Sequence, residues 1–198
     1  MEKRSKDLLA KLEKKTMIRN RKQSITEMKR LTPIQYKEAH LLPLTILLED
    51  VRSAQNVGAI FRTADAFRVE EIVLTGITPR PPHPLIHKTA LGAEDAVPFR
   101  YAPIALEVIE EYKMKGYEVW CLEQTIHSTP LEECFMEESK ILLVAGNEVH
   151  GVSEELVAQA DRAVEIPQFG TKHSLNVSVS VGVALYALLS PLWGNLQK

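Results

Sequence analysis

The sequence predicts an α/β fold with a mostly parallel sheet and helices on both of its faces. Three observations predict it. Five short apolar runs rich in β-branched residues are typical of buried strands, and segments with helical spacing lie between several of them. The 198 residues are 45% hydrophobic and 25% charged, which is typical of one globular domain. Strands that alternate with helices favour a parallel sheet covered on both faces.

The first forty residues predict a short helical extension. Leucines at residues 8–12 have helical spacing, and Ser24 with Glu27 forms a capping-box pattern. Thr32 before Pro33 has the N-cap and first-turn chemistry of a further helix. We therefore expect a helical extension over residues 1–40 and one main domain over residues 41–198.

Strands and helices are expected to alternate in the main domain. The expected strands are residues 44–48, 71–75, 117–122, 141–146 and 163–166, and the expected helices are residues 56–67, 104–115 and 154–159. The Pro-rich segment 79–84 predicts an extended loop, because proline lacks an N–H group and fixes its own φ angle. Residues 176–190 stay ambiguous, since alternating valines favour a strand and the later leucines favour a helix.

The charge of the chain is unevenly distributed. Residues 1–40 carry a net charge of +7, whereas residues 41–198 carry −9. A basic extension of this kind suits contact with polyphosphate, although a solvated helical surface has the same composition.

Composition also argues against several classes of protein. The apolar stretches 141–145 and 183–189 are shorter than a membrane span, and the N-terminus has no apolar export signal. Cys121 and Cys134 lie in apolar surroundings without metal-finger spacing, so we expect both to be reduced and structural. We therefore expect a cytoplasmic protein without a membrane segment.

Polar residues gather in three otherwise apolar stretches, residues 55–67, 145–155 and 166–180. Two of them follow expected strands, where α/β sheets form their ligand crevice. Taken singly, each residue has a plain structural explanation. Asn56, Ser174 and Asn176 could be capping or turn residues, Arg62 could pair with Asp65, and Glu148 could be a loop carboxylate.

Taken together, the three stretches resemble the three motifs of the SpoU-type (TrmH-like) RNA ribose 2′-O-methyltransferases of the SPOUT class. The segments are Asn56 to Arg62 with the following RTAD, GNEVHGVSEE at 146–155, and Ile166, Pro167 and Gly170 with SLNVSVS at 174–180. The resemblance covers residues 44–190. It implies transfer of a methyl group from S-adenosyl-L-methionine to a ribose 2′-hydroxyl of RNA.

The resemblance also implies structure and partners. It predicts a deep C-terminal trefoil knot over residues 140–190, an exception to the usual absence of knots. It makes residues 176–190 a helix and implies a homodimer through this C-terminal helix. The knotted loops would hold the cofactor largely by backbone groups around the following residues: Gln124, Gly146, Ile166, Ser174 and Leu175.

The same resemblance assigns roles to the motif residues. Arg62 would hold an RNA phosphate and stabilise the developing alkoxide, or act as the base. Asn56 and Asn176 would position Arg62 and the ribose, Glu148 would orient the site, and Ser174 would lie near the cofactor or the target nucleotide. Lys88 is either a contact to an RNA phosphate or a plain surface lysine. No metal is expected, because His83 and His87 lack further ligands.

Alternatives to this interpretation remain. Transfer RNA is favoured as substrate by the basic extension, with ribosomal RNA second. A catalytically silent RNA-binding scaffold of the same fold is a different class, as is a nucleotide-binding α/β protein unrelated to methylation.

Overall fold

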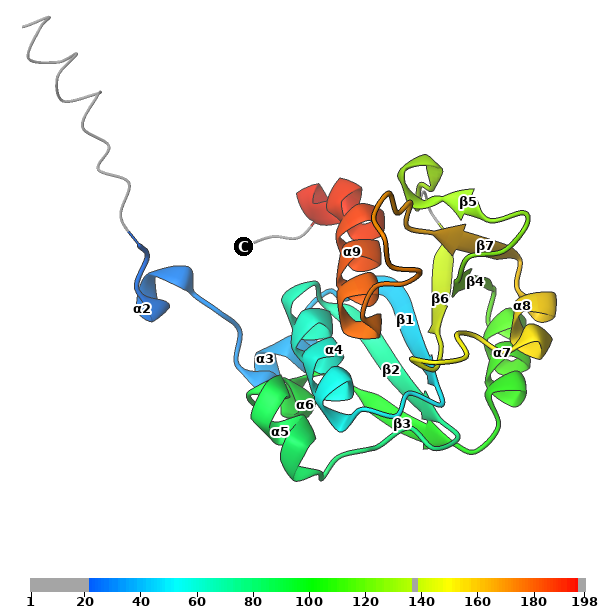
Figure 1. Cartoon of the computed structure of the whole chain (residues 1–198). Coiled ribbons are helices and arrows are strands. Elements are labelled where there is room, and N and C mark those ends of the chain that lie inside the picture. The colour runs from blue at the N-terminus through cyan, green and yellow to red at the C-terminus, as the bar shows by residue number, and fades with distance from the viewer. Residues whose placement is uncertain (1–21, 137–138, 196–198) are drawn as a thin grey trace, which may run out of the picture. The chain divides into compact units, whose positions relative to one another are not determined.

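A computed structural model describes residues 22–136 and 139–195 of the chain (Figure 1). The described residues fall into two units, one that ends at Leu31 and one that begins at Thr32. The first contains helix α2 (Ile25–Met28), where Ser24 and Glu27 form the expected capping box. The helical spacing at residues 8–12 lies outside the described residues.

The second unit is built on a seven-stranded sheet, and all of its strand pairs are parallel. The strand order is β3-β2-β1-β6-β4-β7-β5. The strands are β1 Leu42–Glu49, β2 Val69–Thr75, β3 Phe99–Ala102, β4 Tyr117–Leu122, β5 Thr129–Pro130, β6 Lys140–Ala145 and β7 Arg162–Glu165. The predicted parallel α/β fold is confirmed. The sequence did not predict β3 and β5, which are the two short edge strands.

Helices cover both faces of the sheet (Figure 1). The helices are α3 Pro33–Glu38, α4 Ala54–Ala66, α5 Pro84–Ala90, α6 Ala93–Ala96, α7 Ala105–Met114, α8 Glu154–Gln159 and α9 Val177–Leu189, with 3₁₀ turns η1 Leu131–Glu133 and η2 Ser190–Asn195. One core joins the sheet to helices that include α4 and α9 and contains Phe61 and Leu185. The other core, on the opposite face, contains Ile109 of α7 and Leu156 of α8.

Helix α3 belongs to the globular unit although it carries the end of the basic segment. Tyr36 is 2% exposed, and its hydroxyl donates a hydrogen bond to the Val69 carbonyl oxygen at 2.8 Å. The compact unit that contains α3 begins at Thr32.

Helices α5 and α6 follow the Pro-rich loop, where the sequence predicted no helix. His83 is the N-cap of α5 and Pro84 its first residue. The helix crosses α4 at Gly58, where a Cβ atom would lie 2.5 Å from the Ile86 carbonyl oxygen. The Thr89 hydroxyl donates to the Gln55 carbonyl oxygen at 3.1 Å and joins the two helices beside this contact. Only glycine allows this approach.

The ambiguous segment near the C-terminus is a helix, α9. Its buried residues, Val181, Ala184, Leu185, Leu188 and Leu189, have the spacing of one helix face. Among the described residues, Val177–Gly194 is long and apolar enough to cross a membrane by length and composition. That is weak support for a membrane segment, because core helices pass the same test.

Both cysteines are buried and unpaired, as the sequence predicted. Burial raises the pKa of the Cys121 thiol to about 12, and the nearby carboxylates of Glu49 and Glu123 add to the effect. The thiol is therefore protonated and unreactive at neutral pH.

The crossing of α4 and α5 gives a stability prediction. Gly58→Ala should destabilise the protein by about 1–3 kcal/mol, because the new methyl group overlaps backbone that cannot move freely. Gly182→Ala in α9 is the matched control. Its Cβ would meet only Thr63 at 3.7 Å, so the substitution should stabilise by about 0.4–1 kcal/mol. Denaturant unfolding measures both, and equal effects of the two substitutions would contradict the close crossing.

Candidate functional site

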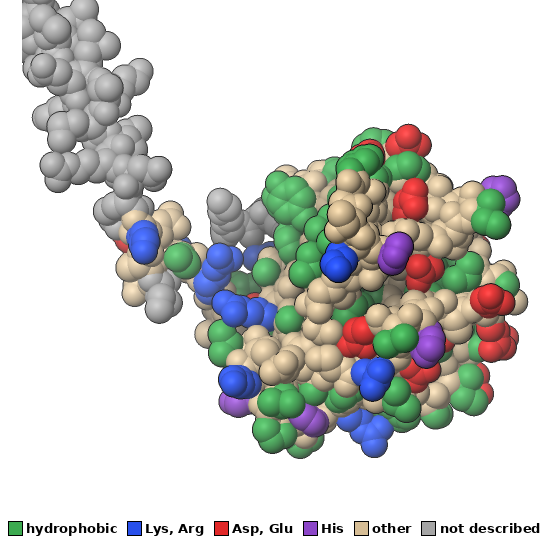
Figure 2. All heavy atoms as spheres, viewed as in Figure 1, with side chains coloured by type: hydrophobic (Ala, Val, Ile, Leu, Met, Phe, Trp, Pro, Cys, Tyr) green, Lys and Arg blue, Asp and Glu red, His purple; other side chains and the backbone are tan. Residues whose placement is uncertain are grey.

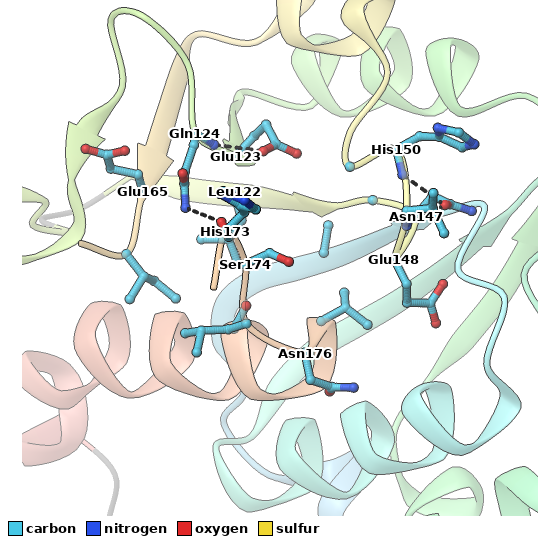
Figure 3. Close-up of a pocket in the computed structure, with 18 of the residues that line it drawn as sticks. Leu122, Glu123, Gln124, Asn147, Glu148, His150, Glu165, His173, Ser174 and Asn176 are labelled. Carbon is cyan, nitrogen blue, oxygen red and sulfur yellow. Dashed lines mark hydrogen bonds between the residues drawn. The ribbon is translucent and has the colours of Figure 1, made fainter. Parts of the chain in front are cut away.

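A cavity of about 530 Å³ opens at the carboxyl ends of strands β4, β6 and β7 (Figure 3). Its walls come from residues 122–124 after β4, residues 145–151 after β6, and the segment from residue 164 in β7 to residue 180 in α9. This is the edge of a parallel sheet where loops from several strands converge. The last two segments are two of the three polar stretches noted in the sequence.

All five residues that the sequence analysis assigned to a cofactor line this cavity. They are Gln124, Gly146, Ile166, Ser174 and Leu175. Gln124 reaches across the cavity, and its Nε2 donates to the His173 carbonyl oxygen at 3.4 Å (Figure 3). This bond joins the loop after β4 to the segment before α9.

A line of hydrogen bonds joins the three polar stretches at the cavity. Asn56 Nδ2, from α4, donates to Glu148 Oε1 at 2.9 Å. Asn176 Nδ2 donates to Asn56 Oδ1 at 3.1 Å. The Asn176 Oδ1 atom accepts from the Ser178 N–H at 2.9 Å and so caps helix α9. The three side chains are therefore fixed relative to one another, as an orienting role for them requires.

Glu148 also holds the start of helix α4. Its Oε2 accepts from the Arg52 N–H at 2.8 Å, and its Oε1 accepts from the Ser53 N–H at 3.0 Å. Burial raises the pKa of Glu148, but the hydrogen bonds from Arg52, Asn56 and Ser53 outweigh burial and lower it. The carboxylate is therefore ionised at neutral pH, at the end of a helix where a negative charge is favoured.

The loop after β6 is shaped by its own backbone. A Cβ atom on Gly146 would lie 2.2 Å from the Gly151 carbonyl oxygen. The Asn147 N–H donates to the Gly151 carbonyl oxygen at 2.9 Å, and the Gly151 N–H donates to the Asn147 carbonyl oxygen at the same distance. The Asn147 side chain donates from Nδ2 to the Asp50 carbonyl oxygen at 2.7 Å. Glu123 Oε2 accepts the Val152 N–H at 2.9 Å from the other side.

Two of these loop-holding residues had no assigned role in the sequence. Asn147 lies inside the second polar stretch, so its position was a signal that could have found it. Glu123 follows a strand without any distinguishing pattern, and its contact with Val152 spans 29 residues. Only the folded structure identifies it.

The two cations predicted to meet RNA are not in the cavity wall. Arg62 is exposed on α4, and Lys88 is exposed on α5. Neither is among the residues that line the cavity. Their predicted contacts must therefore be made with a ligand that extends beyond the cavity.

The lining chemistry suits S-adenosylmethionine. Three carboxylates, Glu123, Glu148 and Glu165, line the cavity, and the described lining contains neither Lys nor Arg. Acidic side chains also gather over the part of the surface that carries β7 and α8 (Figure 2). Such a wall favours a ligand with ammonium and sulfonium charges over one with phosphates. Within the described ranges, no three His, Cys, Asp or Glu side chains are placed to hold a metal ion.

Comparison with known proteins identifies a family for the chain. Residues 43–186 match the SpoU rRNA Methylase family. The chain is 35% identical over 143 residues to a tRNA (guanosine(18)-2′-O)-methyltransferase of Thermus thermophilus, a match that covers 72% of each chain. It is 31% identical over 144 residues to the 23S rRNA (guanosine-2′-O-)-methyltransferase RlmB of Neisseria meningitidis, which covers 72% of this chain and 56% of that protein.

Solved structures show the same fold. The A. aeolicus TrmH/SpoU tRNA modifying enzyme superposes with a TM-score of 0.72 at 25% identity, covering 82% of this chain and 83% of that one. An AdoMet-bound rRNA methyltransferase from Sinorhizobium meliloti gives a TM-score of 0.71 at 26% identity, covering 85% and 62%. With a family match over residues 43–186 and a relative that is 35% identical over 72% of both chains, the chain belongs to the SpoU methylase family.

Proposed function

We propose that this protein transfers a methyl group from S-adenosyl-L-methionine to a ribose 2′-hydroxyl of RNA. The observation that carries the proposal is the hydrogen-bonded line from Glu148 through Asn56 to Asn176 beside an acidic cavity. The family membership and the names of the relatives support the same reaction.

The chain's own residues would align and activate the hydroxyl. S-adenosylmethionine, when bound, supplies a methyl group already activated on a sulfonium. The ribose oxygen would take the methyl carbon from the sulfonium sulfur, which would leave as a neutral thioether with the electron pair of the C–S bond, and the hydroxyl proton would pass to water or an RNA phosphate. Asn56 and Asn176 would hold the ribose in line with the methyl group, since their amides are fixed by each other and by Glu148. Ser174, in the cavity wall, would contact the cofactor or the target nucleotide.

Arg62 is assigned to the RNA backbone. Its side chain is exposed on α4, six residues after Asn56 and outside the cavity wall. A guanidinium in this place suits a charge-assisted hydrogen bond to a phosphate and stabilisation of negative charge on the reacting oxygen. Lys88, exposed on α5, would meet a further phosphate.

Transfer RNA is the proposed substrate class. The Thermus relative and the A. aeolicus structure are named for tRNA, while the Neisseria relative is named for 23S rRNA, which is the second candidate. The net charge of +7 on residues 1–40 supports RNA contact by this segment.

We propose a cytoplasmic location for the protein. The support is that both cysteines, Cys121 and Cys134, are buried and unpaired, which suits the reducing cytoplasm.

We also propose the trefoil knot over residues 140–190 and a homodimer through α9. Both cavity-lining segments after β6 and β7 lie in the proposed knot. For the dimer, the supporting observation is an apolar surface on α9, where Val179, Val183 and Tyr186 are 51%, 40% and 59% exposed.

A methyl-transfer assay tests the reaction. Radiolabelled S-adenosylmethionine is incubated with unmodified total tRNA or with rRNA, and the labelled nucleosides are identified after digestion. We expect label in a 2′-O-methylnucleoside from tRNA, and a loss of at least about 100-fold in Arg62→Ala. Arg162→Ala is the control, because it also removes an arginine but one that does not line the cavity. Arg162 is the first residue of β7, and its guanidinium lies over the Trp120 ring. Cofactor binding without transfer to either RNA would reject both RNA classes as substrates, whereas the absence of both binding and transfer would support the silent scaffold.

Glu148→Gln tests the carboxylate that joins the motifs. Because the folded-state pKa of Glu148 is lowered, its stabilisation is complete above the ordinary pKa and is lost as pH falls through the folded value. The variant should lose about 1 kcal/mol of stability at pH 7 and less at pH 3. The loss at pH 7 is small because solvent screens the charge of this exposed group. It should also lose methyl transfer. Denaturant unfolding across pH, with Glu110→Gln on α7 as control, measures the stability change; a pH-independent loss would refute the ionic role.

The dimer proposal is tested at Val183. Val183→Lys places a charge on the exposed face of α9 and keeps good helix propensity. Light scattering should give the mass of a dimer for the wild-type protein and of a monomer for the variant. A dimer that survives the substitution would place the interface elsewhere.

A further inference from the structure

The loops that follow β1 and β2 are joined into one surface beside the candidate site. Asp50, directly after β1, accepts the Ile77 N–H on its Oδ1 atom at 2.8 Å. In the other direction, the Thr78 hydroxyl accepts the Val51 N–H at 3.1 Å. Thr78 is 4% exposed, and its hydroxyl donates to the Leu48 carbonyl oxygen at 3.1 Å. These bonds fix the two loops relative to each other.

Each of the two loops carries an exposed arginine. Arg52 follows Val51, and Arg80 lies two residues after Thr78. Among the residues that the structure describes, neither guanidinium makes an ion pair with Asp or Glu. Lys and Arg side chains are visible at the lower centre of Figure 2, over the loops that lead from the sheet to α4 and α5. Because residues 41–198 carry a net charge of −9, unpaired arginines on this surface are a local exception that suits an anionic ligand.

The Arg80 side chain is held on an aromatic ring. Its guanidinium lies over the Tyr101 ring, 4.2 Å from the ring centroid. The ring is fixed in turn, because the Tyr101 hydroxyl donates to the Gly76 carbonyl oxygen at 3.0 Å. A guanidinium that stacks by its face keeps the N–H groups at its edge available, and these match the oxygens of a phosphate. Arg80 is therefore positioned in advance for a phosphate.

The sheet order places these residues in a row that starts at the candidate site. Glu148 follows β6 and Arg52 follows β1. Arg80 follows β2, and Tyr101 lies near the carboxyl end of β3. These four strands are neighbours in that order. At about 4.8 Å between neighbouring strands, the row is roughly 14 Å long. A stacked RNA strand of about four nucleotides, at ~3.4 Å each, has the same length.

Arg52 connects this row to the reacting end. Its own N–H donates to Glu148 Oε2 at 2.8 Å, and the other oxygen of that carboxylate holds the Asn56 amide at 2.9 Å. A strand whose ribose lies at Asn56 could therefore continue over Arg52 toward Arg80.

We propose that Arg52 and the Arg80–Tyr101 pair form a further RNA contact, which binds the phosphates of nucleotides beside the methylated one. Arg80 would bind one phosphate through the edge of its stacked guanidinium, and Arg52 would bind a phosphate nearer the site. The inference rests on the proposed function in taking RNA as the ligand. It adds a path for the strand, from the first cavity along the carboxyl ends of β1, β2 and β3.

The salt dependence of RNA binding tests the proposal. Fluorescence anisotropy measures binding of fluorescein-labelled, unmodified total tRNA to the full chain at several KCl concentrations. Contacts to phosphates do not depend on sequence, so mixed tRNA is a valid probe. We expect Arg80→Ala to weaken binding about fivefold, and to reduce the slope of log K against log salt by about 1, the effect of one lost phosphate contact. Arg52→Ala should act in the same direction.

Arg162→Ala is the matched control. It also removes a guanidinium that lies over an aromatic ring, 4.8 Å from the Trp120 centroid, but at the amino end of β7. Its affinity and salt slope should equal those of the wild-type protein. Both tested arginines are exposed, so their substitution should leave denaturant unfolding unchanged. Wild-type affinity in both variants, an unchanged salt slope, an equal loss in the control, or no binding of tRNA by the wild-type protein would overturn the proposal.

Steady-state methyl transfer separates this proposal from the proposed function. Arg80→Ala should raise the KM for RNA about fivefold and leave kcat and the KM for S-adenosylmethionine unchanged, because Arg80 would contact RNA away from the reacting nucleotide. Methyl transfer with an unchanged KM for RNA in Arg80→Ala would reject the further contact alone. A salt slope that falls in Arg80→Ala, in a protein that transfers no methyl group, would support the contact and reject the methyltransferase proposal.

Discussion

The carboxylate of Glu148 is the interaction on which the arrangement of the candidate site depends. It comes from the loop after β6, accepts two backbone N–H groups at the start of α4, and binds the amide of Asn56. Asn56 in turn accepts from Asn176, the N-cap of α9. One negative charge thereby fixes the relative positions of the loop after β6 and the starts of helices α4 and α9, which lie far apart in the sequence. Without it, the N–H groups of Arg52 and Ser53, just before α4, and the amide of Asn56 would lose their acceptor.

The parallel sheet makes this meeting possible. Strand β6 lies between β1 and β4, so the loop after β6 emerges beside the loop that leads from β1 into α4. The same edge carries Gln124 after β4 and the segment after β7. The cavity is thus a product of strand order, and the identity of the side chains decides only what it can bind.

Much of the fold could be predicted from local signals. Ser24 with Glu27 and Thr32 with Pro33 marked the starts of α2 and α3, and the helix expected at residues 154–159 is α8, which Ser153 caps. Caps are local chemistry and need no knowledge of the rest of the chain. The edge strands β3 and β5 and the short helices α5 and α6 were missed, because they are too brief to show a period. Helix α9 is apolar on most sides, so its valines could not decide between helix and strand until its packing was known.

The site could be predicted only in part. The sequence named Glu148, Asn56 and Asn176 through a family resemblance. The hydrogen bonds between these side chains join residues 92 and 120 positions apart, so they follow from the topology and not from local sequence.

The close contact between Gly146 and Gly151 has a consequence for how such a scaffold diversifies. A Cβ atom at residue 146 would overlap the opposite strand of the loop, so main-chain atoms form the turn that bounds the first cavity. A wall made of backbone changes little when side chains around it are exchanged by mutation. A second cavity of about 620 Å³, by contrast, is lined by side chains of a proline-rich loop, two short helices (α5 and α6) and Phe99. Substitutions there can change the shape and charge of that cavity while the backbone wall of the first cavity stays constant, and a designer can use the same difference.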